Sequence, residues 1–200
     1  MYAQHAEDDI ILKLFDGYVG RFLDIGANDG QYLSNTRALA EQGWGGVLVE
    51  PNPWTFLRLA KLYRGLNMHL PCCNFAVGLE DCLTLFYQAT KDNGLSSTEV
   101  SQVVNREAEG EYLAPFWVAM VSIGRLLDQF PGHFDFLSID TEGTSVDLFL
   151  RFPFSRVLPR VVCVEHDYRV QECINHATHW RYRLVHQNPI NLIFELESCG

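Results

Sequence analysis

The sequence lacks the long apolar segments that mark membrane proteins and secreted precursors. No run approaches the length of about 18 apolar residues that a membrane-spanning helix needs. The N-terminal segment 1–16 is too acidic to be a secretory signal peptide. We therefore expect a protein with no membrane span.

The cysteines also lack any recognisable arrangement. The 6 cysteines form neither a CxxC pair nor the spacing of a zinc finger. Cys163 lies in the apolar run Val161–Val164, where a free thiol behaves as a small hydrophobe. We expect the cysteines to be free, which indicates a reducing compartment and a cytoplasmic location.

Positive charge is scarce. Lys and Arg number 15 against 25 Asp and Glu, which gives a formal net charge of −10, and the basic residues form no run. A negative field of this kind repels nucleic-acid phosphates and anionic lipid. We therefore expect no nucleic-acid partner.

The 200 residues have an ordinary globular composition, with 48% hydrophobic and 20% charged residues. A chain of this length buries roughly 70% of the surface that its unfolded form exposes, so it can fold without a disulfide or a metal. We expect a single domain over residues 1–200, which can also be one domain of a longer protein.

Short β-branched or aromatic runs alternate with segments of helical period, which predicts an α/β fold with a mostly parallel sheet. The strands are predicted at 21–25, 47–50, one within 69–77, 82–87, 116–121, 134–139 and 161–164. The helices are predicted from the turn at 26–30 to about 42, then at 54–63, 122–130, 143–152 and 170–177. A closing antiparallel hairpin is predicted over 183–196.

A polar segment at 90–112 is too long for a simple connector, and insertions of this kind are often lids or binding loops. We expect an acceptor-binding insertion around residues 90–115, in which Ser96, Ser97 and the nearby Trp117 contact an acceptor. The alternative for Trp117 is a position in the hydrophobic core.

A cofactor site is predicted where the first strand ends. The segment Leu23–Gly30 (LDIGANDG) places small residues in a turn between a strand and a helix, where a ligand can approach the backbone. Glu50 ends the second strand about twenty residues later, the spacing at which a carboxylate accepts hydrogen bonds from ribose hydroxyls. Together they indicate a nucleoside cofactor. The alternative is that Gly26 and Gly30 only allow close packing.

The turn favours S-adenosylmethionine over NAD. It has Asn28 where the dinucleotide fingerprint GxGxxG has its middle glycine, and Asn tolerates the left-handed backbone of such a turn. Asp24 and Asp29 add negative charge, which disfavours a pyrophosphate and suits a sulfonium cation.

Acidic residues follow two of the predicted strands. Asp140 and Glu142 come after the strand at 134–139, and Glu165 and His166 end the strand at 161–164. The carboxyl ends of neighbouring parallel strands meet at one edge of a sheet, so we expect these residues to lie close together.

Three roles are open for this group. It can supply a general base for a hydroxyl acceptor, with His166 favoured because its reference pKa is near 6.5. It can hold Mg²⁺ or Mn²⁺, which prefer carboxylate and imidazole ligands. Finally, Asp140 and Glu142 can cap the following helix.

Several short motifs occur along the chain in a characteristic order. They are YAQHAED at 2–8, DIGANDG at 24–30, GVLVEPNP at 46–53, NFAVG at 74–78, LSIDTEG at 137–143 and NLIFE at 191–195. In these motifs the sequence resembles the FkbM family of methyltransferases over nearly its whole length. One departure is Ser145, where the family often has glutamate.

The resemblance implies a single Rossmann-like class I methyltransferase domain with a mostly parallel seven-stranded sheet and a C-terminal antiparallel hairpin. It also implies which residues contact S-adenosylmethionine. They are Asp24, Gly26, Ala27, Asn28, Asp29 and Gly30 at the methionine part, Glu50, Pro51 and Asn52 at the ribose, and Asn74, Phe75 and Ala76 at the adenine. Gln4, Glu7 and Asp8 would line the mouth of the pocket; their alternative is an exposed helix start.

We therefore expect an S-adenosylmethionine-dependent O-methyltransferase, and the resemblance supplies a sugar or glycan as the acceptor. The alternatives are methylation of a polyketide or other small metabolite, an NAD-linked oxidoreductase, and a non-catalytic cofactor-binding partner domain.

Overall fold

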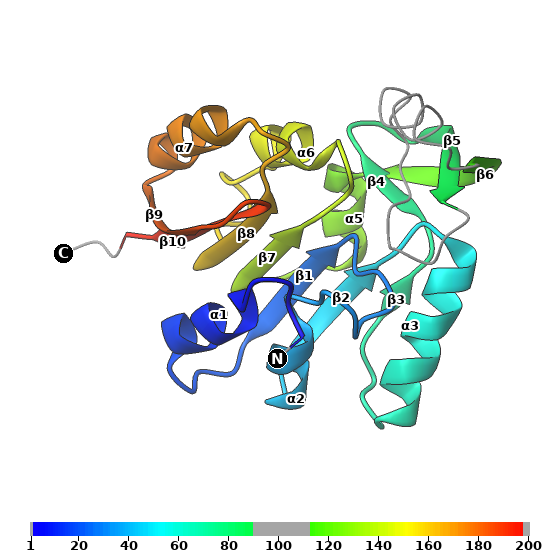
Figure 1. The fold of residues 1–200 in the computed structure, drawn as a ribbon, viewed down its shortest axis with the longest axis horizontal. Coiled ribbons are helices and arrows are strands. Elements are labelled where there is room, and N and C mark those ends of the chain that lie inside the picture. The colour runs from blue at the N-terminus through cyan, green and yellow to red at the C-terminus, as the bar shows by residue number, and fades with distance from the viewer. Residues whose placement is uncertain (1, 90–112, 198–200) are drawn as a thin grey trace.

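The computed structural model describes residues 2–89 and 113–197 (Figure 1). Most of the predicted acceptor-binding insertion, including Ser96 and Ser97, lies outside the described residues. The cysteines within the described ranges are free, as predicted. No helix in these ranges is long and apolar enough to cross a membrane.

The main sheet has 7 strands in the order β3-β2-β1-β7-β8-β10-β9. Their bounds are β1 Arg21–Ile25, β2 Gly45–Val49, β3 Cys72–Cys73, β7 Phe136–Ile139, β8 Val161–Glu165, β9 Tyr182–Gln187 and β10 Asn191–Leu196. The strands from β3 to β8 pair in parallel, and β10 pairs antiparallel with β8 and β9. The predicted parallel sheet with a closing antiparallel hairpin is confirmed.

Helices cover both faces of this sheet (Figure 1). One face packs against α1 Glu7–Phe15, α2 Arg37–Glu41 and α3 Pro53–Gly65, and the other against α5 Ile123–Gln129, α6 Ser145–Arg151 and α7 Val170–His179. Successive residues of a strand alternate between two cores, so that Phe22 faces α1 while Leu23 faces α5. Burial on both faces explains why the central strands are almost entirely apolar.

A second sheet lies beside the first. It contains β4 Ala76–Gly78, β5 Cys82–Ala89 and β6 Leu113–Ser122 in the order β4-β6-β5, with β5 antiparallel to β6. The strand predicted within 69–77 is confirmed as β3, and the chain then forms a further short strand, β4, in the second sheet. Asn74 lies between β3 and β4. Its side-chain amide donates to the carbonyls of Glu50 (2.9 Å) and Pro51 (3.0 Å), which follow β2.

The helix after the glycine turn is shorter than predicted, since α2 begins only at Arg37. Local side-chain hydrogen bonds take the place of a first helical turn. Asp29 Oδ1 accepts from the amides of Gln31 (2.9 Å) and Tyr32 (2.8 Å), and Ser34 Oγ accepts from the amide of Arg37 (3.1 Å). These Asx-type bonds compete with helix formation over residues 29–36.

Candidate active site

The glycine turn packs directly against the end of a neighbouring strand. Gly26 has φ +89°, and a Cβ there would lie 1.7 Å from the carbonyl oxygen of Asp140. Gly30 has φ +76°, and a Cβ there would lie 2.5 Å from Leu59 Cδ1. Both glycines are therefore needed for packing, and at Gly26 this packing joins the turn to the end of β7. Asn28 has φ 50°, the left-handed conformation predicted for it.

Glu50 connects the turns that follow β1 and β2. Its Oε2 accepts from the amide of Asn28 (3.0 Å) and its Oε1 from the amide of Asn52 (2.8 Å). The side chain is only 7% exposed, and burial raises its pKa to about 7 although both amides favour the charged form. A carboxylate has about four acceptor positions, so Glu50 retains capacity for the hydroxyls of a ribose.

Asp24 lies beneath the turn. Its carboxylate is 3% exposed and accepts a hydrogen bond from Thr36 Oγ1 at 2.5 Å. Burial raises the pKa of Asp24 to about 6, against hydrogen bonds from Thr36 and Ser138 that lower it. The structure thus places this side chain in an internal polar network, where it supports the turn from below.

The residues expected near the ribose shape the backbone. Asn52 Oδ1 accepts from the amides of Trp54 (3.0 Å) and Thr55 (3.3 Å) and so caps the start of α3, which Pro53 opens. Pro51 is half-buried between Glu50 and this cap.

The residues expected near the adenine divide between the two sheets. Asn74 bonds to the backbone after β2, whereas Phe75 is half-buried against the core and Ala76 is buried within β4. At the methionine end, Ala27 is buried and its amide donates to the carbonyl of Val49 (2.9 Å).

The structure brings three of the predicted acidic residues together. One carboxylate oxygen from each of Asp140, Glu142 and Glu165 lies within 4.8 Å of the other two. Glu165 Oε2 accepts from the amide of Glu142 (3.1 Å) and from Ser145 Oγ (2.8 Å). We call Asp140, Glu142 and Glu165 the acidic cluster.

The environment of Asp140 favours its protonated form. Burial raises its pKa well above the ordinary value, and the neighbouring charges of Glu165 and Glu142 raise it further. A carboxylate in this environment binds a proton much more tightly than a solvated aspartate does. Asp140 is therefore suited to accept a proton from a bound hydroxyl.

The structure adds a fourth acid that sequence reasoning missed. Asp167 lies near the start of α6, where burial and the charge of Glu165 raise its pKa to about 6, although the backbone amides of Val146 and Gly143 favour its charged form. Asp167 lies two residues beyond the end of β8, and this position is the sequence feature from which it could have been predicted.

His166 lies in a different environment from the one expected of a general base. Its Nδ1 accepts from the amide of Tyr168 (3.2 Å), and its Nε2 lies 3.3 Å from the carbonyl oxygen of Asn188, to which it donates. With both ring nitrogens bonded to backbone groups, the ring presents no nitrogen to the acidic cluster.

Of the residues expected at the mouth of the pocket, Glu7 and Asp8 are buried and Gln4 is exposed. Glu7 is fully buried, and its Oε1 accepts from the side-chain amides of Asn188 (2.7 Å) and Asn191 (2.8 Å). Burial opposes ionisation of Glu7, but these hydrogen bonds outweigh it and the net pKa is lowered. Asp8 is also buried and accepts from the amide of Tyr2 (2.6 Å). The alternative of an exposed helix start is therefore wrong for Glu7 and Asp8.

Trp117 lies on β6 and is 65% exposed. The alternative of a position in the core is wrong, because the side chain belongs to a strand whose other face packs inward through Phe116 and Val118.

With this geometry in place, comparison with known proteins decides the family. A family model described as the methyltransferase FkbM domain matches residues 24–197. The chain belongs to this family. The chain is thus a methyltransferase domain, and FkbM membership implies the use of S-adenosylmethionine in general.

Solved structures support the fold of this FkbM domain. A methyltransferase FkbM from Methylobacillus flagellatus is similar with a TM-score of 0.55 and 12% identity, over 88% of this chain and 43% of that one. TehB from Haemophilus influenzae is similar with a TM-score of 0.53 and 9% identity, over 98% of this chain and 64% of TehB. The chain thus spans less than half the length of the M. flagellatus protein. No curated protein sequence matches it.

Proposed function

We propose that this domain is an S-adenosylmethionine-dependent O-methyltransferase that acts on a hydroxyl group of a sugar or glycan. Family membership supports methyl transfer. The acceptor class rests on the sequence resemblance and is supported by the exposed ring of Trp117, since aromatic faces suit sugar rings. The free cysteines support a reducing, cytoplasmic location as part of the proposal.

One observation carries the proposal: the acidic cluster and the glycine turn touch. The amide of Asp140 donates to the carbonyl of Ile25 (2.9 Å), and the carbonyl of Asp140 occupies the space where a side chain at Gly26 would be. Both features lie at the carboxyl ends of β1 and β7, the edge at which open α/β sheets bind their ligands.

The chain's residues then divide the work. S-adenosylmethionine, when bound, supplies a methyl group from its sulfonium centre. Glu50 accepts hydrogen bonds from the ribose hydroxyls, and the turn residues Gly26–Gly30 approach the methionine part. Asp140 takes the proton from the acceptor hydroxyl, and Glu165 raises the proton affinity of Asp140.

A divalent metal is the alternative role for the acidic cluster. Its carboxylate oxygens are hard ligands of the kind that Mg²⁺ and Mn²⁺ prefer, and their mutual distances of at most 4.8 Å are compatible with one shared ion. This role still belongs to methyl transfer, since the ion would orient the acceptor oxygen.

The test is transfer of a labelled methyl group to a panel of saccharides and of non-sugar hydroxyl compounds, with the methylated position assigned by NMR. We expect label on a saccharide hydroxyl. Label found only on a non-sugar hydroxyl would show that the acceptor is another small metabolite and not a sugar or glycan. No transfer despite binding of S-adenosylhomocysteine would favour a non-catalytic partner domain, and calorimetric binding of NAD alone would favour an oxidoreductase.

A further inference from the structure

Helix α3 carries positive charge on a strongly acidic protein. The segment 51–79 contains no Asp or Glu, although the whole chain has a net charge of −10. Within it, α3 presents Arg58, Lys61 and Arg64, and all of these side chains are exposed. The repulsion of phosphates expected from the net charge therefore does not apply to this surface.

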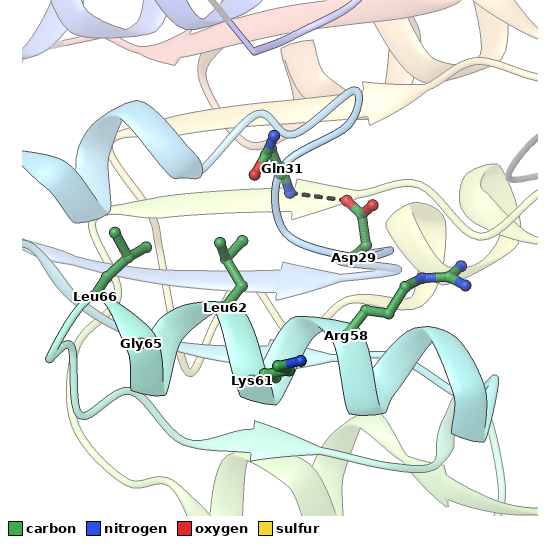
Figure 2. Close-up of a pocket in the computed structure, with 7 residues that line it drawn as sticks. All are labelled: Asp29, Gln31, Arg58, Lys61, Leu62, Gly65 and Leu66. Carbon is green, nitrogen blue, oxygen red and sulfur yellow. Dashed lines mark hydrogen bonds between the residues drawn. The ribbon is translucent and has the colours of Figure 1, made fainter.

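A groove of about 460 Å³ runs along this helix. It lies between Asp29 and Gln31, just after β1, and a second wall formed by Arg58, Lys61 and Leu62 of α3 with the C-cap residue Leu66 (Figure 2). We call it the α3 groove. From Arg58 to Leu66 the helix advances about 12 Å, at 1.5 Å a residue.

The two ends of the α3 groove differ in chemistry. Arg58 lies at the end that Asp29 borders, Lys61 and Leu62 lie in the middle, and Leu66 lies at the other end, one helical turn beyond Leu62 (Figure 2). Lys61 forms no ion pair within the part of the chain that the structure describes. The groove is thus positive at one end and apolar along its length.

Asp29 and Gly65 complete the lining. Asp29 is the one acid, and its Oδ1 already accepts the amides of Gln31 and Tyr32, which offset part of its charge. A Cβ built on Gly65 meets nothing within 4 Å, so the wall beside the leucines is open and can admit a chain of methylenes.

We propose that the α3 groove binds a phosphate monoester that carries a linear hydrocarbon chain. The phosphate lies beside Lys61 and Arg58, and the chain lies along Leu62 and Leu66. A phosphate monoester carries a charge of about −1.5 to −2 at neutral pH and has three acceptor oxygens, so it can meet both cations at once. A carboxylate has less charge and fewer acceptors for the same pair.

The α3 groove shares Asp29 with the glycine turn, but its other lining residues lie outside the methyl-transfer site. It starts near the glycine turn but follows α3 away from the carboxyl edge of the sheet, toward the C-terminal end of the helix at Leu66 (Figure 2). The proposal does not rest on methyl transfer, and its test needs no methyl donor.

The test is calorimetric titration of the full chain with propyl, pentyl and heptyl phosphate. We expect binding that tightens two- to fourfold with each added methylene, the ratio that burial of a methylene group gives. Amide resonances of Gln31 and Leu62 should shift in the same titration of the unmodified protein. Saturating S-adenosylhomocysteine should leave the affinity within twofold, and displacement by it would overturn a separate site.

Matched variants on the same helix sharpen the result. Lys61→Glu should weaken binding at least tenfold, whereas Arg64→Glu, also exposed on α3 but outside the groove, should change it less than twofold. Leu66→Ser should remove most of the dependence on chain length, and Leu57→Ser, an exposed leucine outside the groove, should preserve it. Equal effects of the groove variants and their controls would overturn the proposal.

A second arm identifies the source of the phosphate. Vesicles of phosphatidylcholine with and without phosphatidic acid are tested for sedimentation of the protein. Binding to soluble alkyl phosphates supports a free phosphate ester. Binding only to phosphatidic acid vesicles, with loss in Lys61→Glu, supports a lipid head group as the same ligand chemistry. Failure of both arms overturns the proposal.

Discussion

The two ends of the active site stabilise their buried carboxylates in different ways. At the cofactor end, the two oxygens of Glu50 accept hydrogen bonds from the backbone amides of Asn28 and Asn52, and burial is the main reason for its raised pKa, with a smaller contribution from the charge of Asp24. At the catalytic end, the charges of Glu165 and Glu142 add to the burial of Asp140. Backbone amides thus fix Glu50 as a hydrogen-bond acceptor, whereas burial and neighbouring charges increase the proton affinity of Asp140.

This difference separates binding from chemistry. Hydrogen bonds from fixed backbone amides keep Glu50 in one position, which suits recognition of a ribose. Burial and the charges of the neighbouring acids raise the pKa of Asp140, which suits a general base. Substitutions at the two ends should therefore affect different steps.

The largest effect is expected at the catalytic end. Asp140→Asn keeps the shape of the side chain and removes the proton acceptor, so methyl transfer should fall about 10²- to 10⁴-fold, the usual contribution of a general base. The measurement is label incorporation at saturating donor. Asp147→Asn, an exposed acid on α6, is the control and should keep at least half of the activity. A normal rate of methyl transfer by Asp140→Asn would show that Asp140 is not the general base.

The next effect is expected at the cofactor end. Glu50→Gln replaces a charged acceptor of two amides with a neutral one and should weaken binding of S-adenosylhomocysteine about 10- to 100-fold, as hydrogen bonds to charged groups predict. At saturating donor its transfer rate should stay within about threefold of the unsubstituted protein. A lost rate with unchanged affinity would reverse the assignment of the two ends.

Glu50 also makes stability depend on pH. Its folded-state pKa of about 7 exceeds its unfolded value, so the folded chain binds more protons and loses stability as pH rises through that range. Between pH 4 and pH 8, Glu50→Gln should gain about 3 kcal/mol in unfolding free energy relative to the unsubstituted protein. Urea unfolding measures this. Glu80→Gln, at an exposed position, should show no such trend.

The smallest effect is expected from removal of metal. If the acidic cluster acts through proton transfer, EDTA should leave the rate of methyl transfer within twofold. A loss that Mg²⁺ or Mn²⁺ restores would show instead that the cluster holds a cation, and Glu142→Gln should then weaken the response to added metal.

The sequence alone predicts the central part of this account. The strand at 21–25, the left-handed Asn28 and the closing hairpin all follow from local patterns, and the structure confirms them. The meeting of Asp140 with Glu165 follows from parallel topology, because the carboxyl ends of adjacent strands share one edge.

Long-range partners account for what the sequence did not predict. Glu7 is buried because its hydrogen-bond donors are Asn188 and Asn191, far along the chain, and no local pattern reveals them. His166 follows a strand end as predicted, but both nitrogens of its ring form hydrogen bonds with the backbone of Tyr168 and Asn188. In both cases tertiary contacts determine the environment of a residue whose position was predicted correctly.

The central claim is that binding and proton transfer are carried by separate carboxylates. Calorimetric titration of S-adenosylhomocysteine into Asp140→Asn tests it most directly. We expect an affinity within about threefold of the unsubstituted protein, because Asp140 acts on the acceptor rather than on the ribose. A loss of affinity as large as that of Glu50→Gln, in a variant that remains folded, would contradict it.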